Sequence, residues 1–161
     1  MAWAKNGTPN TLSGTADDCD ITDLTAYKFN VFLFHKMQDT DVTSMALTFN
    51  NNSNSVYARR GSTNGGTDFT STSGANWNMQ SNNADDEFFI AYVCSISGEE
   101  KLGIMFTVSG GGAGASNDPE RKEQVGKFVP SPDADITRID LNNSDAGNYG
   151  IGTNLSAIGT D

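Results

Sequence analysis

Cysteine and histidine are scarce in this 161-residue chain, which contains two cysteines and one histidine. Cys19 and Cys94 have no Cys-x-x-Cys spacing, so a zinc site of usual ligand spacing cannot be built from these residues and His35. Two separated cysteines also make no disulfide framework and do not fix the redox compartment. Cys94 alternates with apolar residues, so we expect it to be a small core residue, and we expect both cysteines to be buried free thiols.

Recognisable catalytic motifs are also lacking. No Gly-x-Ser-x-Gly motif accompanies His35, so the sequence indicates no serine–histidine–aspartate triad. We expect His35 to be a hydrogen-bonded core residue. The glycine-rich run 109–116 lacks the Gly-Lys-Ser/Thr ending of a phosphate-binding loop, and it is interpreted as a flexible connection. The sequence therefore predicts no catalytic residues, no cofactor and no enzymatic activity.

Basic residues are few, since 10 lysines and arginines stand against 20 acidic residues and give a net charge of −10. This charge repels a phosphate backbone, so direct binding to nucleic acid is not expected, and it suits a surface that faces water. Acidic groups recur at Asp17/Asp18/Asp20, Asp39/Asp41, Asp85/Asp86/Glu87 and Asp133/Asp135. None has the spacing of a calcium loop, so no metal site is predicted, although calcium binding stays open.

Long apolar runs are absent as well. No stretch approaches the roughly 18 apolar residues of a membrane span, and we expect no membrane partner. The segment Met1-Ala2-Trp3-Ala4-Lys5 lacks the apolar run of a signal peptide.

Short strands with period-2 alternation occur along the chain, whereas helical periodicity does not extend beyond about two turns. The segments are 28–37, 45–49, 56–60, 68–72, 87–97, 101–109, 121–129, 136–141 and 155–158. Both faces of 28–37 are apolar, which predicts a central strand packed on both sides. Asn64-Gly65-Gly66 is a hairpin signal, and Gly103 suggests a bulge or a close backbone approach. We predict an all-β fold of about ten strands without substantial helix, a β-sandwich of jelly-roll type.

One domain spans residues 1–161, because no linker or change of composition divides the chain. Residues 1–10 form a candidate N-terminal arm, for which Trp3 supplies a large apolar anchor. This arm either reaches a neighbouring subunit or folds back on its own sheet. The loop 109–116 is a second candidate for contact between subunits.

Aromatic and arginine residues supply the candidate subunit contacts, which are Trp3, Tyr57, Arg59, Arg60, Trp77 and Tyr149. The four aromatic residues could instead stack on sugars or fill the core. Arg59 and Arg60 are adjacent on a strand, so their side chains face opposite sides and form no common basic patch. One of them is expected to pair with a carboxylate.

Several short motifs resemble a recurring pattern in small virion-associated structural proteins of tailed phages and marine viruses. The motifs are Phe49 to Arg60, Asn64-Gly65-Gly66, Gly98 to Leu102, Ala113-Gly114 through Arg121-Lys122-Glu123 to Gly126-Lys127, Ile136 to Ile139, and Gly152 to Gly159. The resemblance spans residues 23–161. It implies a structural role in a virion and supplies no catalytic residues.

Two hypotheses follow. The first is a virion structural protein, a capsid decoration or a surface or appendage subunit, which forms a homo-oligomer and contacts a major capsid or tail protein. The second is a carbohydrate-binding β-sandwich module with a glycan partner. Large apolar subunit contacts would favour the first hypothesis, and an exposed aromatic platform would favour the second.

Overall fold

The computed structural model describes residues 2–39, 43–80, 85–130 and 134–161. These ranges hold thirteen strands and no helix. The strands are β1 (Ala4–Lys5), β2 (Asn10–Thr11), β3 (Asp18–Ile21), β4 (Phe29–Lys36), β5 (Ala46–Phe49), β6 (Tyr57–Thr63), β7 (Phe69–Gly74), β8 (Trp77–Asn78), β9 (Glu87–Cys94), β10 (Lys101–Ser109), β11 (Glu120–Phe128), β12 (Ile139–Asn142) and β13 (Asn154–Thr160). The all-β prediction is confirmed.

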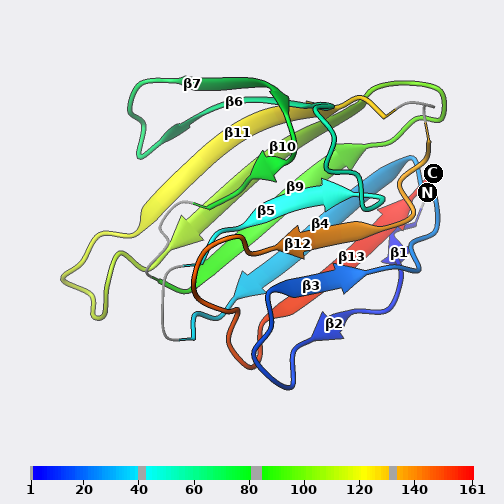
Figure 1. The fold of residues 1–161 in the computed structure, drawn as a ribbon. Coiled ribbons are helices and arrows are strands. Elements are labelled where there is room, and N and C mark those ends of the chain that lie inside the picture. Colours follow the sequence, from blue (N-terminus) through cyan, green and yellow to red (C-terminus); the bar gives the residue numbers. More distant parts are fainter. Residues whose placement is uncertain (1, 40–42, 81–84, 131–133) are drawn as a thin grey trace.

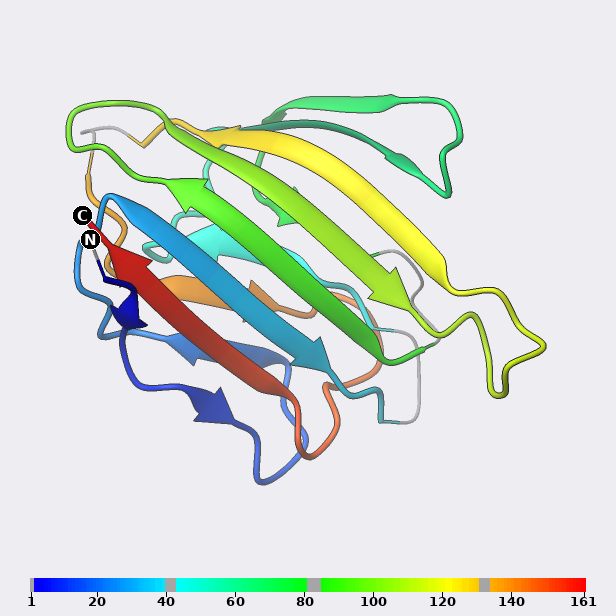
Figure 2. The same ribbon diagram turned by 180° about the vertical axis from the view of Figure 1, so that it is seen from behind.

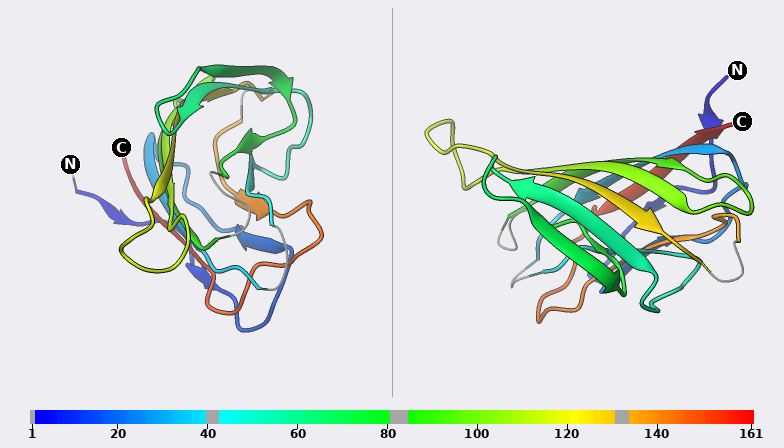
Figure 3. Two further views of the ribbon diagram at one scale, coloured as in Figure 1. Left: turned by 90° about the vertical axis from the view of Figure 1, so that its left-hand side faces the viewer. Right: turned by 90° about the horizontal axis from the view of Figure 1, so that it is seen from above.

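The strands form two antiparallel sheets of unequal size (Figure 1). The large sheet has the order β1-β13-β4-β9-β10-β11-β6-β7, with β2 also paired to β13, and the small sheet has the order β3-β12-β5-β8. The small sheet lies against one face of the large sheet as a second layer, and β6 and β7 curl over its edge (Figure 3). The molecule is therefore a lopsided sandwich, while the jelly-roll type stays a prediction.

Aromatic side chains fill the space between the sheets. The ring of Phe49 lies 5.3 Å from the Trp77 indole in an edge-on arrangement, and the rings of Tyr57 and Phe128 stack at 4.8 Å. The Tyr57 hydroxyl accepts a hydrogen bond from the Phe49 amide and donates one to the Asn52 carbonyl. Since a buried phenol needs a polar partner, these bonds allow Tyr57 to occupy the core.

Two glycines make room for the Trp77 indole. Gly103 and Gly126 are direct cross-strand partners on β10 and β11. A Cβ atom would lie 2.9 Å from the Trp77 ring at Gly103 and 2.6 Å from it at Gly126. Gly103 therefore marks a close approach, but the approaching group is the Trp77 side chain of the opposite sheet rather than the backbone that the sequence predicted.

Tight turns connect several of the strands. Asn64 and Gly65 both have positive φ, the conformation that a two-residue hairpin turn requires, and they join β6 to β7 as predicted. The loop 110–119 joins β10 to β11 and projects well beyond the body of the sandwich (Figure 2).

The N-terminal arm folds back on its own sheet. β1 and β2 both pair with β13, and the two chain ends lie side by side (Figure 1). Asn6, between these short strands, is buried; its side chain exchanges hydrogen bonds with the Thr25 backbone and donates to the Asn30 side-chain oxygen. The arm therefore closes one edge of the large sheet, which is the second of the two alternatives that the sequence left open.

Candidate functional site

The most unusual feature of the surface is the outer face of the large sheet, which is turned toward the viewer in Figure 2. On β10 the side chains of Leu102, Ile104, Phe106 and Val108 are between 41% and 56% exposed. The residues between them are buried against the small sheet. β10 lies between β9 and β11, so this apolar row occupies the interior of the sheet rather than an edge.

Neighbouring strands extend the row sideways. The strand registers place Ile158, Val31, Tyr92, Ile104 and Val125 next to one another across β13, β4, β9, β10 and β11. We call the whole surface the outer apolar face. Its members are Phe29, Val31, Leu33, Phe88, Ile90, Tyr92, Leu102, Ile104, Phe106, Val108, Val125 and Ile158.

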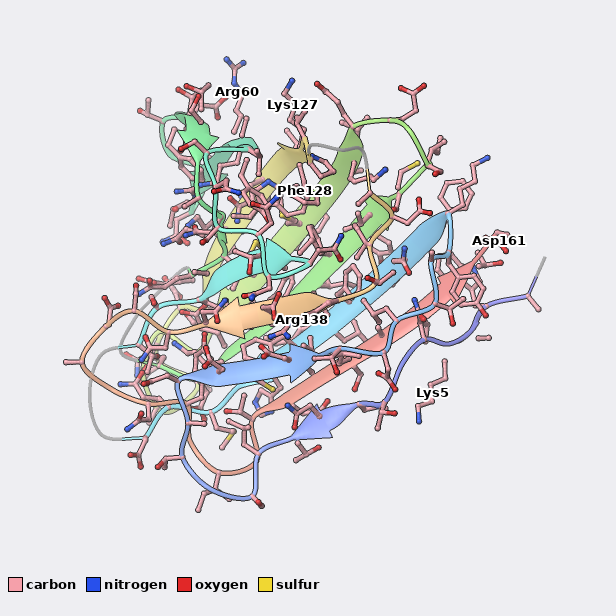
Figure 4. The ribbon with its side chains drawn as sticks, turned by 45° about the vertical axis from the view of Figure 1, so that its right-hand side comes forward. Lys5, Arg60, Lys127, Phe128, Arg138 and Asp161 are labelled. Carbon is pink, nitrogen blue, oxygen red and sulfur yellow. The ribbon has the colours of Figure 1, made fainter. Side chains whose placement is uncertain are left out.

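A depression of about 800 Å³ lies over one end of this face. Phe29, Leu102 and Val125 line it, and Trp3 lies at its border. Among the residues that line it, the charged side chains on the outer side of the sheet are those of Arg60 and Lys127. Figure 4 shows these two side chains projecting from the top of the molecule. The depression is therefore an apolar hollow with a basic border.

The charged residues at the border of the outer apolar face are largely paired within the chain. Arg121 contacts Glu123 at 2.6 Å, and Lys127 contacts Glu100 at 3.2 Å. Exposed pairs of this kind contribute little to stability, but they bring the local charge close to neutral. The face is thus nearly uncharged although the chain carries a net charge of −10.

Three of the predicted contact residues lie at or near the surface. Trp3 is 51% exposed and Arg60 is exposed, and both border the depression. Arg59 points inward from β6 and donates to the Asn78 carbonyl and the Gln124 side chain at 3.3 and 3.4 Å. The predicted opposite orientation of the two arginines is confirmed. These two bonds of Arg59 are to neutral oxygens, so the carboxylate partner expected for one of the two arginines stays a prediction.

The other three predicted contacts are wrong, because Tyr57, Trp77 and Tyr149 are at most 1% exposed. Their polar atoms find partners inside the chain. The Trp77 indole N–H donates to the carbonyls of Ala58 and Lys127, and the Tyr149 hydroxyl donates to the Ser44 carbonyl. They span the gap between the two sheets, so they hold the fold together and present no surface to a neighbour.

His35 and Cys94 are also misplaced by the sequence prediction. Both lie on the outer side of the large sheet, where His35 is exposed and Cys94 is half-buried. The strands that carry them have two apolar faces, and the face taken for core is the one that a single chain leaves open. Cys19 is buried as expected, and burial raises the pKa of its thiol to about 12. Both thiols are free.

The small sheet has an outer face of the opposite character. Arg138 donates to Asp20 at 2.8 Å and also to Asp140, which accepts a further bond from the Asn51 amide. Asp140 is buried and lies directly beside Asp20 in the strand register. Burial and then the charge of Asp140 raise the pKa of Asp20 to about 6. Arg138 lies in front of this sheet in Figure 4.

No group of three or more His, Cys, Asp or Glu side chains within the described ranges could hold a metal ion. Asp41 and Asp133, members of two predicted acidic pairs, lie outside those ranges.

Two buried lysines have partners within the chain. Lys36 pairs with Glu87 at 3.4 Å, and Lys101 donates to two turn carbonyls.

Comparisons with known proteins give no relative. No family model, curated protein or solved structure matches the chain. The described part of the chain contains no helix that is long and apolar enough to cross a membrane.

Proposed function

We propose that this protein is a non-enzymatic virion structural protein that self-assembles on a phage particle, as a capsid decoration or as a surface or appendage subunit. The observation that carries the proposal is the outer apolar face, which crosses five strands of the large sheet. The largest apolar patch of an ordinary monomer covers roughly 300–600 Å² and often serves an interaction. An apolar patch larger than this marks a surface that a partner covers, and this is how we interpret the outer apolar face.

The construction of β4 supports the same conclusion. Phe32 and Phe34 are fully buried between the sheets, while Phe29, Val31 and Leu33 face the other way. A strand with two apolar faces is typical of a sheet that is covered on both sides. One cover is the small sheet. On the other side the chain itself buries Val31 and leaves Phe29 and Leu33 half-buried, so a partner would supply the rest of the second cover.

The distribution of charge fits a subunit with one face hidden and one face in water. The outer side of the small sheet carries Asp18, Asp20 and Arg138, and most of the acidic excess lies in this sheet and in the loops. An acidic, hydrated surface keeps an assembly soluble. The sequence resemblance to phage structural proteins supplies the setting in a virion.

A carbohydrate-binding role has less support. Sugar sites combine exposed aromatic rings with converging polar groups. On the outer apolar face, aliphatic side chains separate the aromatic ones, and Trp77 and Tyr149, two of the candidate stacking residues, are buried. We therefore retain the assembly proposal alone.

Light scattering and negative-stain imaging test the proposal. The purified protein is measured alone and after mixing with the capsid and tail proteins of its own virus. We expect an oligomer that decorates, or forms, a regular particle. A protein that joins no particle in either mixture would overturn the proposed role.

A further inference from the structure

We infer that the outer apolar face is covered by the same face of a second copy of this chain, so that two sandwiches meet face to face in a twofold dimer. This inference rests on the proposed self-assembly and names the partner in it. In such a contact the same patch serves both subunits, and the surface must be complementary to itself.

The area of the face is sufficient for a stable dimer. Ten large apolar side chains on or beside it are roughly half exposed: Trp3, Phe88, Tyr92, Ile96, Leu102, Ile104, Phe106, Val108, Val125 and Ile158. At about 80 Å² each they offer roughly 800 Å², which is the area that one partner buries in an interface of standard size.

The rest of the described surface offers no second apolar patch. Beyond those ten residues, the only large apolar side chain with high exposure in the described ranges is Ile151, at 64%. A head-to-tail contact would need a different apolar surface to receive the outer apolar face. Because the described chain has one such surface, a like-to-like contact is the arrangement that buries apolar area on both partners.

Charge favours the same arrangement. Two chains with a net charge of −10 repel each other, and the repulsion is weakest where they meet through surfaces with few charges. Among the strand residues that face outward from the large sheet, Glu123 is the only acidic one described, and Arg121 pairs with it. Joining these two faces therefore keeps the acidic parts of both copies turned toward water.

Sheet packing supplies the geometry. Two sheets pack about 10 Å apart when side chains from both inner faces interdigitate. The alternating row from Leu102 to Val108 is built for such a contact, and the depression leaves room for side chains of the partner. The resulting dimer has four layers, with the two small sheets on the outside.

The test compares one substitution at two exposed isoleucines. Ile104→Glu places a charge at the centre of the face, and Ile151→Glu places the same charge in the turn before β13. We expect wild type and I151E to have twice the mass of one chain by light scattering at tens of micromolar. We expect I104E to dimerise at least about 100-fold more weakly, because it buries a charge in an apolar contact. Circular dichroism checks that both variants are folded.

The reactivity of Cys94 identifies the face that is covered. Cys94 lies on the outer side of the large sheet, while Cys19 is buried in the core. A thiol reagent should modify Cys94 slowly in the dimer and several-fold faster in I104E. Equal rates in a dimeric wild type and in I104E would show that the dimer uses another surface and would overturn the inference.

The remaining outcomes separate this inference from the proposed function. A wild type that stays monomeric, or whose mass grows continuously with concentration, contradicts the twofold pairing. If that protein still joins a viral particle, the proposed function stands and the face contacts a different partner. A twofold dimer blocked by I104E that joins no particle supports the pairing and contradicts the virion role.

Discussion

The two outer faces of this sandwich differ in how far a single chain satisfies them. On the small sheet, Arg138 donates hydrogen bonds to two neighbouring carboxylates of the same chain, those of Asp20 and Asp140. On the large sheet, a row of apolar side chains crosses five strands, and all of its members except the buried Val31 are exposed. The first face binds its charged groups to one another, whereas the second exposes apolar side chains, which our proposal assigns to a contact with a partner.

Under the proposed assembly, stability and assembly depend on separate surfaces. The core between the sheets and the polar network of the small sheet hold the subunit together. The exposed part of the outer apolar face contributes little to the isolated fold, because that area meets water in the folded chain as it does in the unfolded chain. Substitutions on the three surfaces should therefore differ in size and in kind.

The largest effect is expected on the inner side of β4. Phe32 is fully buried, with its ring centre 5.8 Å from that of Phe49. Phe32→Ala should lower the free energy of unfolding by about 3–5 kcal/mol, because it leaves a cavity in the core. Urea denaturation measures the change. His35→Gln, on the exposed side of the same strand, is the control and should cost less than about 0.5 kcal/mol. Similar costs for both variants would contradict the assignment of the two faces.

The polar network should give the next largest effect. Asp140 is 1% exposed and accepts hydrogen bonds from Arg138 and from the Asn51 amide. Asp140→Ala leaves both donors without this acceptor and should cost about 2–4 kcal/mol. Thermal unfolding at pH 7 provides the measurement. A loss below about 1 kcal/mol would mean that the pair contributes only what an exposed salt bridge does.

The pH dependence of stability should reveal the crowding of carboxylates on the small sheet. The pKa of Asp20 is about 6 in the folded chain, above its unfolded value of about 3.9. The folded state therefore binds the Asp20 proton more tightly than the unfolded state does. The stabilisation that this proton gives to the folded state is fully present below about pH 4 and is lost as the pH rises through about 6.

Asp20→Asn removes that titration. The difference in unfolding free energy between wild type and this variant should change by about 1–2 kcal/mol from pH 4 to pH 7, allowing for partial solvent screening. In Asp140→Asn, the pKa of Asp20 followed by NMR should fall, because a neighbouring charge is gone. An unchanged difference across this pH range would contradict the raised pKa.

The smallest effect is expected on the outer apolar face. Leu102→Gln replaces a side chain that is 56% exposed in the isolated subunit. At concentrations low enough to keep the chain monomeric, it should change the free energy of unfolding by less than about 0.5 kcal/mol. The same variant should bind less of a hydrophobic dye. A large loss of stability in the monomer would show that this face is already buried by the chain itself.

Local features of the fold were predictable from the sequence. The alternation in 101–109 and the turn at Asn64-Gly65 depend on neighbouring residues, so β10 and the β6–β7 hairpin could be located. Short strands escaped prediction, because the two residues of β1, β2 or β8 show no periodicity. Their pairing depends on distant segments such as β13.

The assignment of faces was beyond the sequence. The alternation along β4 puts Phe32 and Leu33 on opposite faces, but it does not say which face meets the small sheet. The sequence therefore predicts a core position for His35, which lies on the exposed face. Tyr149 lies in no extended strand, and isolated bridges to Ala16 and Gln38 carry it into the interior. The adjacency of Arg59 and Arg60 on a strand predicts that one of them faces outward, but it does not say which one.

The loop 110–119 also gives the molecule a practical use. It projects past the ends of β10 and β11, which pair along their whole length down to Ser109 and Glu120 (Figure 3). Exposed loop tips with small residues tolerate insertions well. A foreign peptide placed between Gly112 and Ser116 would therefore extend from the end of the sheet, and a paired assembly would display two copies of it. The subunit is thus a natural scaffold for presenting epitopes.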